Sequence, residues 1–295
     1  MRVFVTGAAS FIGTALLRAC DLRGIEVIGI DATDPVRPDC QRADIRDPSI
    51  GDLIPDAVDA VVHLAALSRD PDCRGRGYEC FDVNVMGTLN VARAARARGA
   101  RHFTFASSEW VYDSFLPGLA RREDDPIDPS RLTSEYALSK LVSECNLRHV
   151  FSAGFCPTTV LRFGIVYGPR RVNHSAAEAL LVEVARSSEV KVGALRTTRG
   201  FIHVDDIADA ILASFEVPGF EILNAQGPAP VTLGEVIEVA RRITGRDPRV
   251  VETAAAAASI RLVSAEKAAR VMGWRARICI ADGLRLVAQY LELAT

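Results

Sequence analysis

Three polar residues stand at a spacing that suits proton transfer. Tyr136 and Lys140 lie four residues apart in a segment of helical character, so their side chains share one helix face. Ser108 comes earlier, directly after an apolar run. An ordinary tyrosine has a pKa of about 10, and a neighbouring ammonium favours the phenolate. Tyr136 is therefore expected to exchange a proton with a substrate oxygen, although the same spacing also suits an amphipathic helix with a solvated lysine.

The chain begins with an element that suits a dinucleotide. Residues 2–6 form a β-branched run, Gly7 and Gly13 follow it, and residues 14–20 have helical character. A strand, a glycine turn and a helix together aim backbone N–H groups at a pyrophosphate. We expect Gly7 to make the tight turn and Gly13 the close helix-to-strand contact. Ser10 stands where the usual fingerprint has its middle glycine, and its side chain could crowd the pyrophosphate or donate a hydrogen bond to it.

The next two strands end in residues that suit an adenosine. Residues 26–30 form an apolar run that ends at Asp31, about 20 residues after the glycines. A carboxylate there accepts hydrogen bonds from both ribose hydroxyls and repels a 2′-phosphate, so NAD is favoured over NADP. A turn or helix cap is the alternative interpretation of Asp31. Asp44 and Ile45 are expected at the end of the third strand, in contact with the adenine.

A fourth apolar run covers residues 60–66 and lacks the alternation of a half-exposed strand. It therefore predicts a strand covered on both faces. Within it, His63 is expected to be a hydrogen-bonded core histidine rather than a catalyst. Ala65 and Ala66 are small and would leave room for a cofactor.

Further strands alternate with helices along the chain. Residues 79–98 read as a helix that carries Asn84, residues 102–106 as a strand that delivers Ser107 and Ser108 at its carboxyl end, and residues 158–163 as another strand. Five or more strands alternating with helices predict an α/β fold with a doubly wound, Rossmann-like parallel sheet. Side chains that do chemistry belong at the carboxyl ends of such strands.

Composition excludes several classes of function. Of the 295 residues, 24% are charged and 49% are apolar, and the net charge is −2, as in an ordinary globular protein. We therefore expect no nucleic-acid partner. No apolar run is long enough to span a membrane. The seven cysteines are scattered, without the spacing of a zinc site, and indicate free thiols in a reducing compartment. Because the chain enters a strand directly after Met1, we expect no signal peptide and a cytoplasmic location.

The motifs resemble those of the extended short-chain dehydrogenase/reductases, in particular the NAD-dependent epimerase/dehydratase family of nucleotide-sugar enzymes. The resemblance covers nearly the whole chain, and the motifs that carry it occur in family order at residues 5–13, 31, 63–66, 84–88, 107–112, 136–140, 161–163, 166–170 and 199–206. It implies that Tyr136 is the acid/base, that Lys140 contacts the nicotinamide ribose and lowers the tyrosine pKa, and that Ser108 hydrogen-bonds the reacting oxygen. A homodimer is also implied, built by helices near residues 84–98 and 135–150.

The resemblance also implies two lobes. Residues 1–168, with residues 201–226 returning to them, would form the NAD-binding domain. Residues 169–200 and 227–295 would form a smaller, C-terminal substrate-binding lobe. The adjacent Asp205 and Asp206 are expected to begin a helix rather than to bind a metal.

NAD is the expected cofactor. The residues expected to bind it are Gly7, Ser10, Phe11, Ile12, Gly13, Asp31, Asp44, Ile45, Leu64, Ala65, Ala66, Asn84, Ala106, Ser107, Tyr136, Lys140 and Phe163. The substrate, a sugar or a sugar nucleotide, is expected to contact Ser108, Glu109 and Arg199.

The chain departs from the family at positions that bear on the reaction. Sugar-nucleotide dehydratases have an acidic pair after the hydroxyl residue, whereas this chain has Glu109 and Trp110. The missing second acid disfavours dehydration, and Glu109 is either a second acid or a solvated or capping group. Ile165 replaces an asparagine, and residues 254–258 are all alanine where an arginine-containing segment is usual. Arg199, alone or together with Arg261, would hold a substrate diphosphate less tightly than a bidentate set of arginines would.

Three functions follow from these residues. The leading hypothesis is an NAD-dependent sugar epimerase, with a nucleotide sugar as the favoured substrate. Such an enzyme withdraws a hydride from a ring carbon and returns it to the other face of the same carbon. The alternative is a net dehydrogenase or ketoreductase acting on a sugar or another alcohol without a nucleotide. A non-catalytic NAD-binding protein is the third, but such a protein does not need Ser108, Tyr136 and Lys140 together.

Overall fold

A single parallel sheet forms the centre of the molecule. The computed structural model describes residues 1–35, 37–116 and 118–293. The strands of the sheet are β1 (Arg2–Thr6), β2 (Glu26–Asp31), β3 (Cys40–Arg42), β4 (Ala60–His63), β5 (Phe103–Ser108), β6 (Thr158–Phe163) and β11 (Phe220–Ala225). They lie in the order β11, β6, β5, β4, β1, β2, β3, and each adjacent pair runs parallel. β3 ends before Asp44 and Ile45, so these two residues follow the strand instead of ending it.

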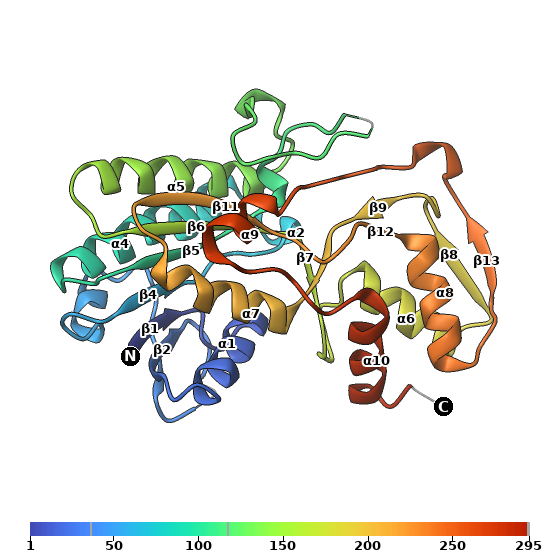
Figure 1. Ribbon diagram of the computed structural model, residues 1–295, viewed down its shortest axis with the longest axis horizontal. Helices are drawn as coiled ribbons and strands as arrows, with labels where there is room; N and C mark the ends of the chain where they lie inside the picture. The colour runs from blue at the N-terminus through green and yellow to red at the C-terminus, as the bar shows by residue number, and fades with distance from the viewer. Residues whose placement is uncertain (36, 117, 294–295) are drawn as a thin grey trace.

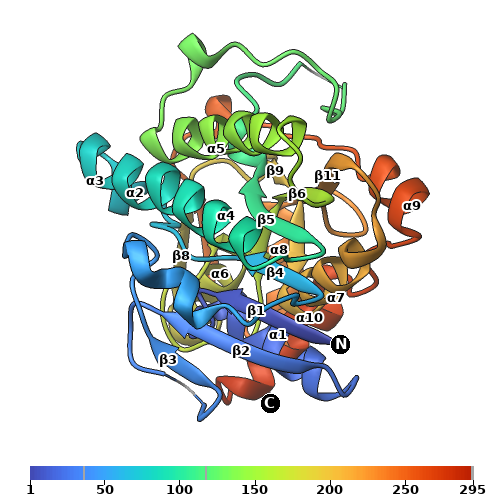
Figure 2. The same cartoon turned by 90° about the vertical axis from the view of Figure 1, so that its left-hand side faces the viewer.

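Helices cover both faces of this sheet (Figures 1 and 2). One face carries α1 (Phe11–Asp21) and α7 (Val204–Ala213), and the other carries α4 (Gly87–Ala97) and α5 (Glu135–Ser152). Successive side chains of β1 enter opposite cores: Val3 and Val5 pack on the α1 side and Phe4 on the α4 side, and all three are fully buried. Strands covered on both faces explain the apolar runs without alternation. The predicted doubly wound fold is therefore confirmed.

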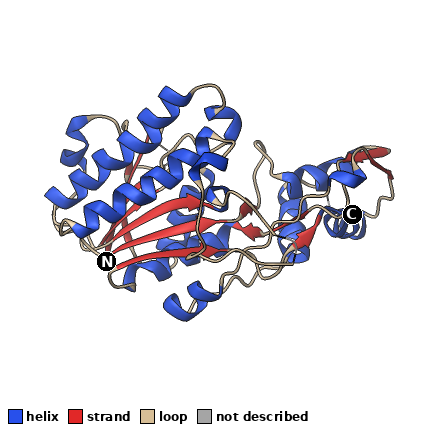
Figure 3. Cartoon of the chain, turned by 90° about the horizontal axis from the view of Figure 1, so that it is seen from above, coloured by secondary structure: helices blue, strands red, loops and turns tan. Residues whose placement is uncertain are grey.

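The strand order reverses between β1 and β4. The connections that follow β1 and β4 run in opposite directions along the sheet, so a crevice opens between the carboxyl ends of these two strands. Gly7 lies in this crevice with a backbone φ of +75°, and a Cβ on it would lie 2.7 Å from the backbone nitrogen of Ala65. Both the conformation and the space therefore require glycine. Figure 3 shows the strands running side by side toward the group of helices near the C-terminus.

The segment predicted as one helix over residues 79–98 has three parts. They are α3 (Gly77–Phe81), the single π-helical turn η2 (Asp82–Met86) and α4. The extra residue in the π-turn places Asn84 in the interior. Close packing follows at Gly87, where a Cβ would lie 2.6 Å from Cδ1 of Ile45.

A second core lies beyond the carboxyl edge of the sheet. Its elements are β7 (Ile165–Tyr167), α6 (Ala176–Arg186), β8 (Glu189–Val192), β9 (Thr198–Arg199), β10 (Phe201–His203), β12 (Val231–Thr232), α8 (Leu233–Thr244), β13 (Arg249–Glu252) and α10 (Ile280–Tyr290). α6, α8 and α10 pack together around Leu181, Ile237 and Leu284, all buried (Figure 1). α9 (Glu266–Met272) packs on β11 instead. The proposed boundaries of the two lobes stay a prediction.

Side chains at the starts of α8 and α7 accept hydrogen bonds from backbone N–H groups. Thr232 caps α8, and its hydroxyl accepts a hydrogen bond from the backbone of Glu235 (3.1 Å). Asp206 lies in the first turn of α7 and accepts hydrogen bonds from the backbone of Arg277 (3.1 Å) and Ile278 (3.0 Å), which fastens the C-terminal segment. No group of three or more potential metal ligands gathers in the described residues. Among the helices of the same residues, none combines the length and apolar character that crossing a membrane requires.

Candidate active site

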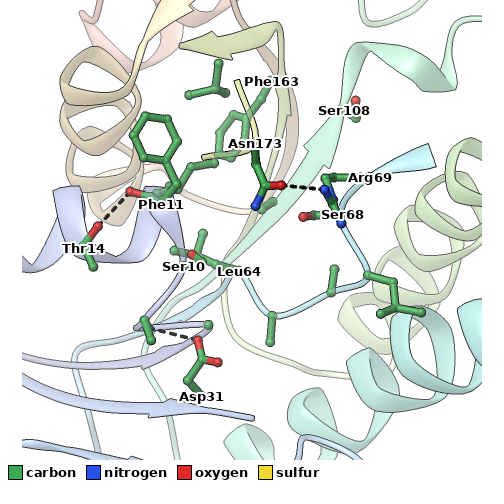
Figure 4. A pocket seen from close by; sticks show the side chains of 18 of the residues that line it. Ser10, Phe11, Thr14, Asp31, Leu64, Ser68, Arg69, Ser108, Phe163 and Asn173 are labelled. Atoms are coloured by element: carbon green, nitrogen blue, oxygen red, sulfur yellow. Dashed lines mark hydrogen bonds between the residues drawn. The ribbon is translucent and has the colours of Figure 1, made fainter. Parts of the chain in front are cut away.

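A cleft of about 1420 Å³ opens at the carboxyl ends of the strands, where the strand order reverses. Figure 4 shows Ser10, Asp31 and Leu64 at one part of it and Ser108 at another. The expected site residues that line the cleft are Gly7, Ser10, Phe11, Ile12, Asp31, Asp44, Ile45, Leu64, Ala65, Ala66, Ala106, Ser107, Ser108, Tyr136, Lys140 and Phe163. The fold thus brings together most of the residues that the sequence singled out.

Asn84 and Gly13 lie behind the wall of the cleft. The Asn84 side chain is buried, accepts a hydrogen bond from the Leu67 N–H (2.8 Å) and donates to the Leu67 carbonyl (3.1 Å) and to Ser139 Oγ (2.9 Å). It holds the loop after β4, so it acts on the cleft through Leu67 and not by touching a ligand. Gly13 makes the expected close contact, since a Cβ there would lie 2.2 Å from the Gly7 carbonyl oxygen.

Ser10 caps the helix that faces the cleft. Its hydroxyl oxygen accepts a hydrogen bond from the backbone N–H of Gly13 at 3.0 Å. The side chain therefore satisfies one of the free N–H groups at the start of α1. A hydroxyl that accepts in this way keeps its own hydrogen for donation, so Ser10 is able to hydrogen-bond an anion at this helix end.

Asp31 lies at the end of β2 and its carboxylate is held by two neighbours. Oδ2 accepts a hydrogen bond from the backbone N–H of Ala9 (3.0 Å), and Oδ1 accepts from the N–H (3.0 Å) and hydroxyl (2.9 Å) of Thr33. The turn that was the alternative interpretation is thus present, and the residue nonetheless lines the cleft. A carboxylate fixed beside the glycine turn fits an adenosine ribose.

The proton-transfer set lies on β5 and α5. Tyr136 and Ser108 both line the cleft, and interaction with the Ser108 hydroxyl lowers the pKa of the phenol. Lys140 is 4% exposed, and its Nζ donates to the Ala106 carbonyl at 2.8 Å. The same Nζ lies 5.9 Å from the centre of the Tyr136 ring. One helix therefore presents a phenol and an ammonium to the same end of the cleft as a hydroxyl.

The tyrosine pKa shifts in the direction opposite to the one expected. Burial raises the pKa of Tyr136 to about 12, against the smaller effect of the Ser108 hydrogen bond, and the Cys73 and Cys80 thiols add to the rise. Burial also lowers the pKa of Lys140 to about 8. The expected lowering of the tyrosine pKa by Lys140 is not found in the protein alone, because removing the phenolate from water costs more than its neighbours return.

A buried ion pair that the sequence did not suggest supports this set. Arg162 Nη2 lies 2.7 Å from Glu144 Oε2, and the two side chains are 3% and 2% exposed. Ser107 donates from its hydroxyl to Glu144 Oε1 at 2.5 Å. These bonds join α5 to β5 and β6 one helical turn beyond Lys140. The four-residue spacing of Lys140 and Glu144 was the only available signal.

The cleft also has a wall whose residues the sequence did not single out as site residues, although residues 169–175 fall within the expected substrate-binding lobe. The segment after β6 supplies most of it, together with Ser68 and Arg69 from the loop after β4 and Tyr290 from α10. The cleft residues of that segment are Gly164, Ile165, Val166, Pro169, Arg170, Arg171, Val172, Asn173, His174 and Ser175. Residues 166–170 were among the motifs that carried the family resemblance, and the Gly168–Pro169 break after β7 was the local signal.

Glu109 and Arg199 do not line the cleft, although both were expected to bind substrate. Glu109 is 1% exposed; with the Gln226 amide oriented to satisfy both neighbours, its nitrogen donates to Glu109 Oε2 (3.2 Å). Burial raises the pKa of Glu109 to about 7, and the nearby positive charges of Arg261 and Arg199 oppose the rise. Arg199 itself donates to the carbonyl groups of Thr198 (2.8 Å) and Ser259 (2.7 Å).

The chain is similar in sequence and in structure to several known proteins. Residues 3–225 match the model of the NAD dependent epimerase/dehydratase family. A dTDP-4-dehydro-6-deoxy-D-allose reductase from Streptomyces sp is 28% identical, over 84% of this chain and 82% of that protein. A UDP-glucose 4-epimerase from Mycolicibacterium smegmatis is 27% identical, over 99% of each. The solved structure of MoeE5 in complex with UDP-glucose and NAD superposes with a TM-score of 0.86 at 26% identity and 99% coverage of both chains.

Proposed function

Because the chain belongs to the NAD dependent epimerase/dehydratase family, we propose that it binds NAD and acts as a nucleotide-sugar epimerase. One observation carries the proposal: Ser108, Tyr136 and Lys140 line one end of the cleft, and Asp31 lines another part of it. A protein that only binds NAD does not need the first three residues. Relatives with epimerase and reductase activity support the reaction class.

Two groups of residues would hold the cofactor. The N-terminus of α1 and the hydroxyl of Ser10 suit the pyrophosphate, and the carboxylate of Asp31 suits the adenosine ribose. Because that carboxylate would repel a 2′-phosphate, we assign NAD rather than NADP. The expected cofactor residues that line the cleft keep this role in the proposal, whereas Asn84 and Gly13 support it from behind.

Proton transfer would be the work of the protein itself. Tyr136 removes a proton from the substrate hydroxyl, and Ser108 hydrogen-bonds the same oxygen. NAD, when bound, supplies the hydride acceptor and a positively charged ring. That charge adds to the ammonium of Lys140 and favours the phenolate, which burial disfavours in the protein alone. Tyr136 then returns the proton to the keto oxygen when the hydride returns to the other face of the carbon.

One experiment separates this function from its alternative. Purified protein is incubated with NAD and a series of sugar nucleotides, and the products are identified by NMR while NADH is followed by absorbance. An epimerase converts the sugar with no accumulation of NADH. Accumulation of NADH in proportion to the oxidised product would instead establish a net dehydrogenase.

The net oxidoreductase remains the second candidate because of one observation. Arg199 is engaged with backbone carbonyl groups, and the alanine stretch at residues 254–258 offers no guanidinium to a substrate diphosphate. A substrate without a nucleotide would not need such contacts. Including free sugars and simple alcohols in the same incubation tests this candidate directly.

The oligomeric state and location are also part of the proposal. α4 and α5 lie next to each other on one face of the sheet (Figure 2), which suits a dimer built by these two helices. All seven cysteines are unpaired, which supports a reducing compartment such as the cytoplasm. Light scattering after gel filtration measures the mass of the assembly, and cell fractionation locates the protein.

A further inference from the structure

Trp110 lies at the reacting end of the cleft and is not explained by the proposed chemistry. It lines the cleft with Ser108 and Tyr136, and it is 37% exposed, whereas the other tryptophan, Trp274, is 7% exposed. The backbone N–H of Trp110 donates to the Ser108 hydroxyl oxygen at 3.2 Å. The backbone of Trp110 is therefore tied to the Ser108 hydroxyl.

Arg261 holds the indole from the segment between β13 and α9. Its guanidinium carbon lies 5.3 Å from the centre of the Trp110 ring and 5.5 Å from the centre of the Phe115 ring. The backbone N–H of Arg261 donates to the carbonyl of Thr198 at 3.2 Å, which anchors the arginine beside β9. A cation at this distance attracts the electron-rich face of an aromatic ring, so the contact restrains the indole.

A tryptophan at this position has a definite chemical consequence. An indole N–H is not an acid that can protonate a leaving hydroxyl, so the residue adds nothing to proton transfer. Its flat face suits the C–H groups on one side of a pyranose ring, which carry a slight positive charge. The hydroxyl groups at the edge of such a ring would then point toward Ser108 and Tyr136.

We propose that Trp110 is a platform on which the pyranose ring of the substrate stacks, and that it determines which sugars present a hydroxyl to Tyr136. The inference rests on the proposed function, since it requires a sugar substrate. The sugar, and not the nucleobase, is assigned to the platform because Trp110 lies two residues from Ser108, beside the reacting atoms. Trp110 is thus a positioning residue, and Arg261 keeps its ring in place.

The chain contains only two tryptophans, so fluorescence can isolate the platform. In a Trp274→Phe variant loaded with NAD, Trp110 is the sole emitter. We expect UDP-glucose to change its emission and UDP alone to leave it unchanged. In activity measurements, Trp110→Ala should raise KM for the sugar nucleotide about tenfold with NAD affinity unchanged, and Trp110→Phe should recover most of the loss because it keeps an aromatic face.

The outcomes are distinguishable. Equal emission changes with UDP and UDP-glucose would assign the ring to the nucleobase and overturn the platform. Unchanged emission with UDP-glucose bound, shown by equilibrium dialysis, would also overturn it, as would an unchanged KM in Trp110→Ala. If Trp274→Phe does not fold, the difference in emission between wild type and Trp110→Phe gives the same readout. Failure of the wild type to bind or convert any sugar nucleotide would remove the proposed function, and the platform with it.

Discussion

The guanidinium of Arg69 donates a hydrogen bond to the side-chain oxygen of Asn173 across the cleft, with Nη1 and Oδ1 2.7 Å apart (Figure 4). Arg69 follows β4, whereas Asn173 follows β7, so the bond joins two loops far apart in the sequence. Asp72 accepts from the other side of the same guanidinium at 2.7 and 2.8 Å and orients it. Both Arg69 and Asn173 line the cleft, so a bound dinucleotide would lie beside this bond.

Removing this bond is expected to speed the release of NAD. Asn173 has a backbone φ of +58°, so Asn173→Gly keeps the backbone conformation while deleting the side chain. An exposed, charge-assisted hydrogen bond contributes about 1 kcal/mol, which corresponds to a roughly fivefold faster dissociation. Stopped-flow displacement of bound NAD measures the rate. Arg74→Ala is the control, because Arg74 pairs with Asp70 on α2 (Asp70–Cys73) and is 78% exposed; equal rates in all three proteins would contradict the prediction.

The Glu144 and Arg162 pair should be needed for stability. Glu144→Gln leaves the guanidinium of Arg162 buried without its counter-charge, and breaking such a pair costs about 3 to 5 kcal/mol. Urea unfolding measures this loss in the free energy of unfolding. Asp282→Asn provides the comparison, since Asp282 and its partner Arg285 form an exposed pair whose loss should change the free energy of unfolding little. Similar losses of unfolding free energy in the two variants would show that burial does not determine how much the Glu144–Arg162 pair stabilises the protein.

The sequence was sufficient for the sheet and for one half of the cleft. Strands covered on both faces leave continuous apolar runs, and Gly7, Asp31 and Ser108 each directly follow or end such a run. Parallel strands bring these ends to one edge, so local patterns were enough to bring these residues together in that half of the cleft. His63 was also predicted correctly as a core residue, since it bonds Thr6 (2.7 Å) and Thr88 (2.9 Å).

The rest depends on contacts between distant segments. The π-helical turn that turns Asn84 inward follows from packing against Leu67 and Ser139, which no local pattern shows. Tyr290 reaches the cleft from the C-terminal helix, far from every motif. The rise in the Tyr136 pKa depends on how completely the folded chain removes the phenol from water, and sequence spacing carries no information on that.

Glu109 should make stability depend on pH in a defined direction. Its pKa rises from about 4.5 to about 7 in the folded chain, so the folded state binds the proton more tightly than the unfolded state does. The resulting stabilisation is complete below about pH 4.5 and is lost as the pH rises to 7, a change of roughly 3 kcal/mol. Glu109→Gln cannot ionise and should lack this dependence.

Urea unfolding of the wild type and of Glu109→Gln from pH 4.5 to 8 measures the difference between their free energies of unfolding. The buried His63, whose pKa burial lowers to about 3, gives a dependence of the opposite sign, but it is common to both proteins and cancels. A difference that stays constant over the whole range would show that Glu109 is ionised in the folded protein. A difference that grows as the pH falls below 7, in favour of the wild type, is the expected result.

Tyr136→Phe is expected to remove turnover while leaving NAD binding intact. The phenol is the group assigned to take and return the proton at the substrate oxygen, and loss of such a group lowers kcat about 10²- to 10⁴-fold. The aromatic ring stays in the wall of the cleft, so the Kd for NAD should change less than about twofold, as measured by calorimetry. Tyr112→Phe is the matched control: it removes a tyrosine hydroxyl that is buried and hydrogen-bonded to Asn224 at 2.8 Å but does not line the cleft. Turnover that survives in Tyr136→Phe at the level of the control would show that another group moves the proton.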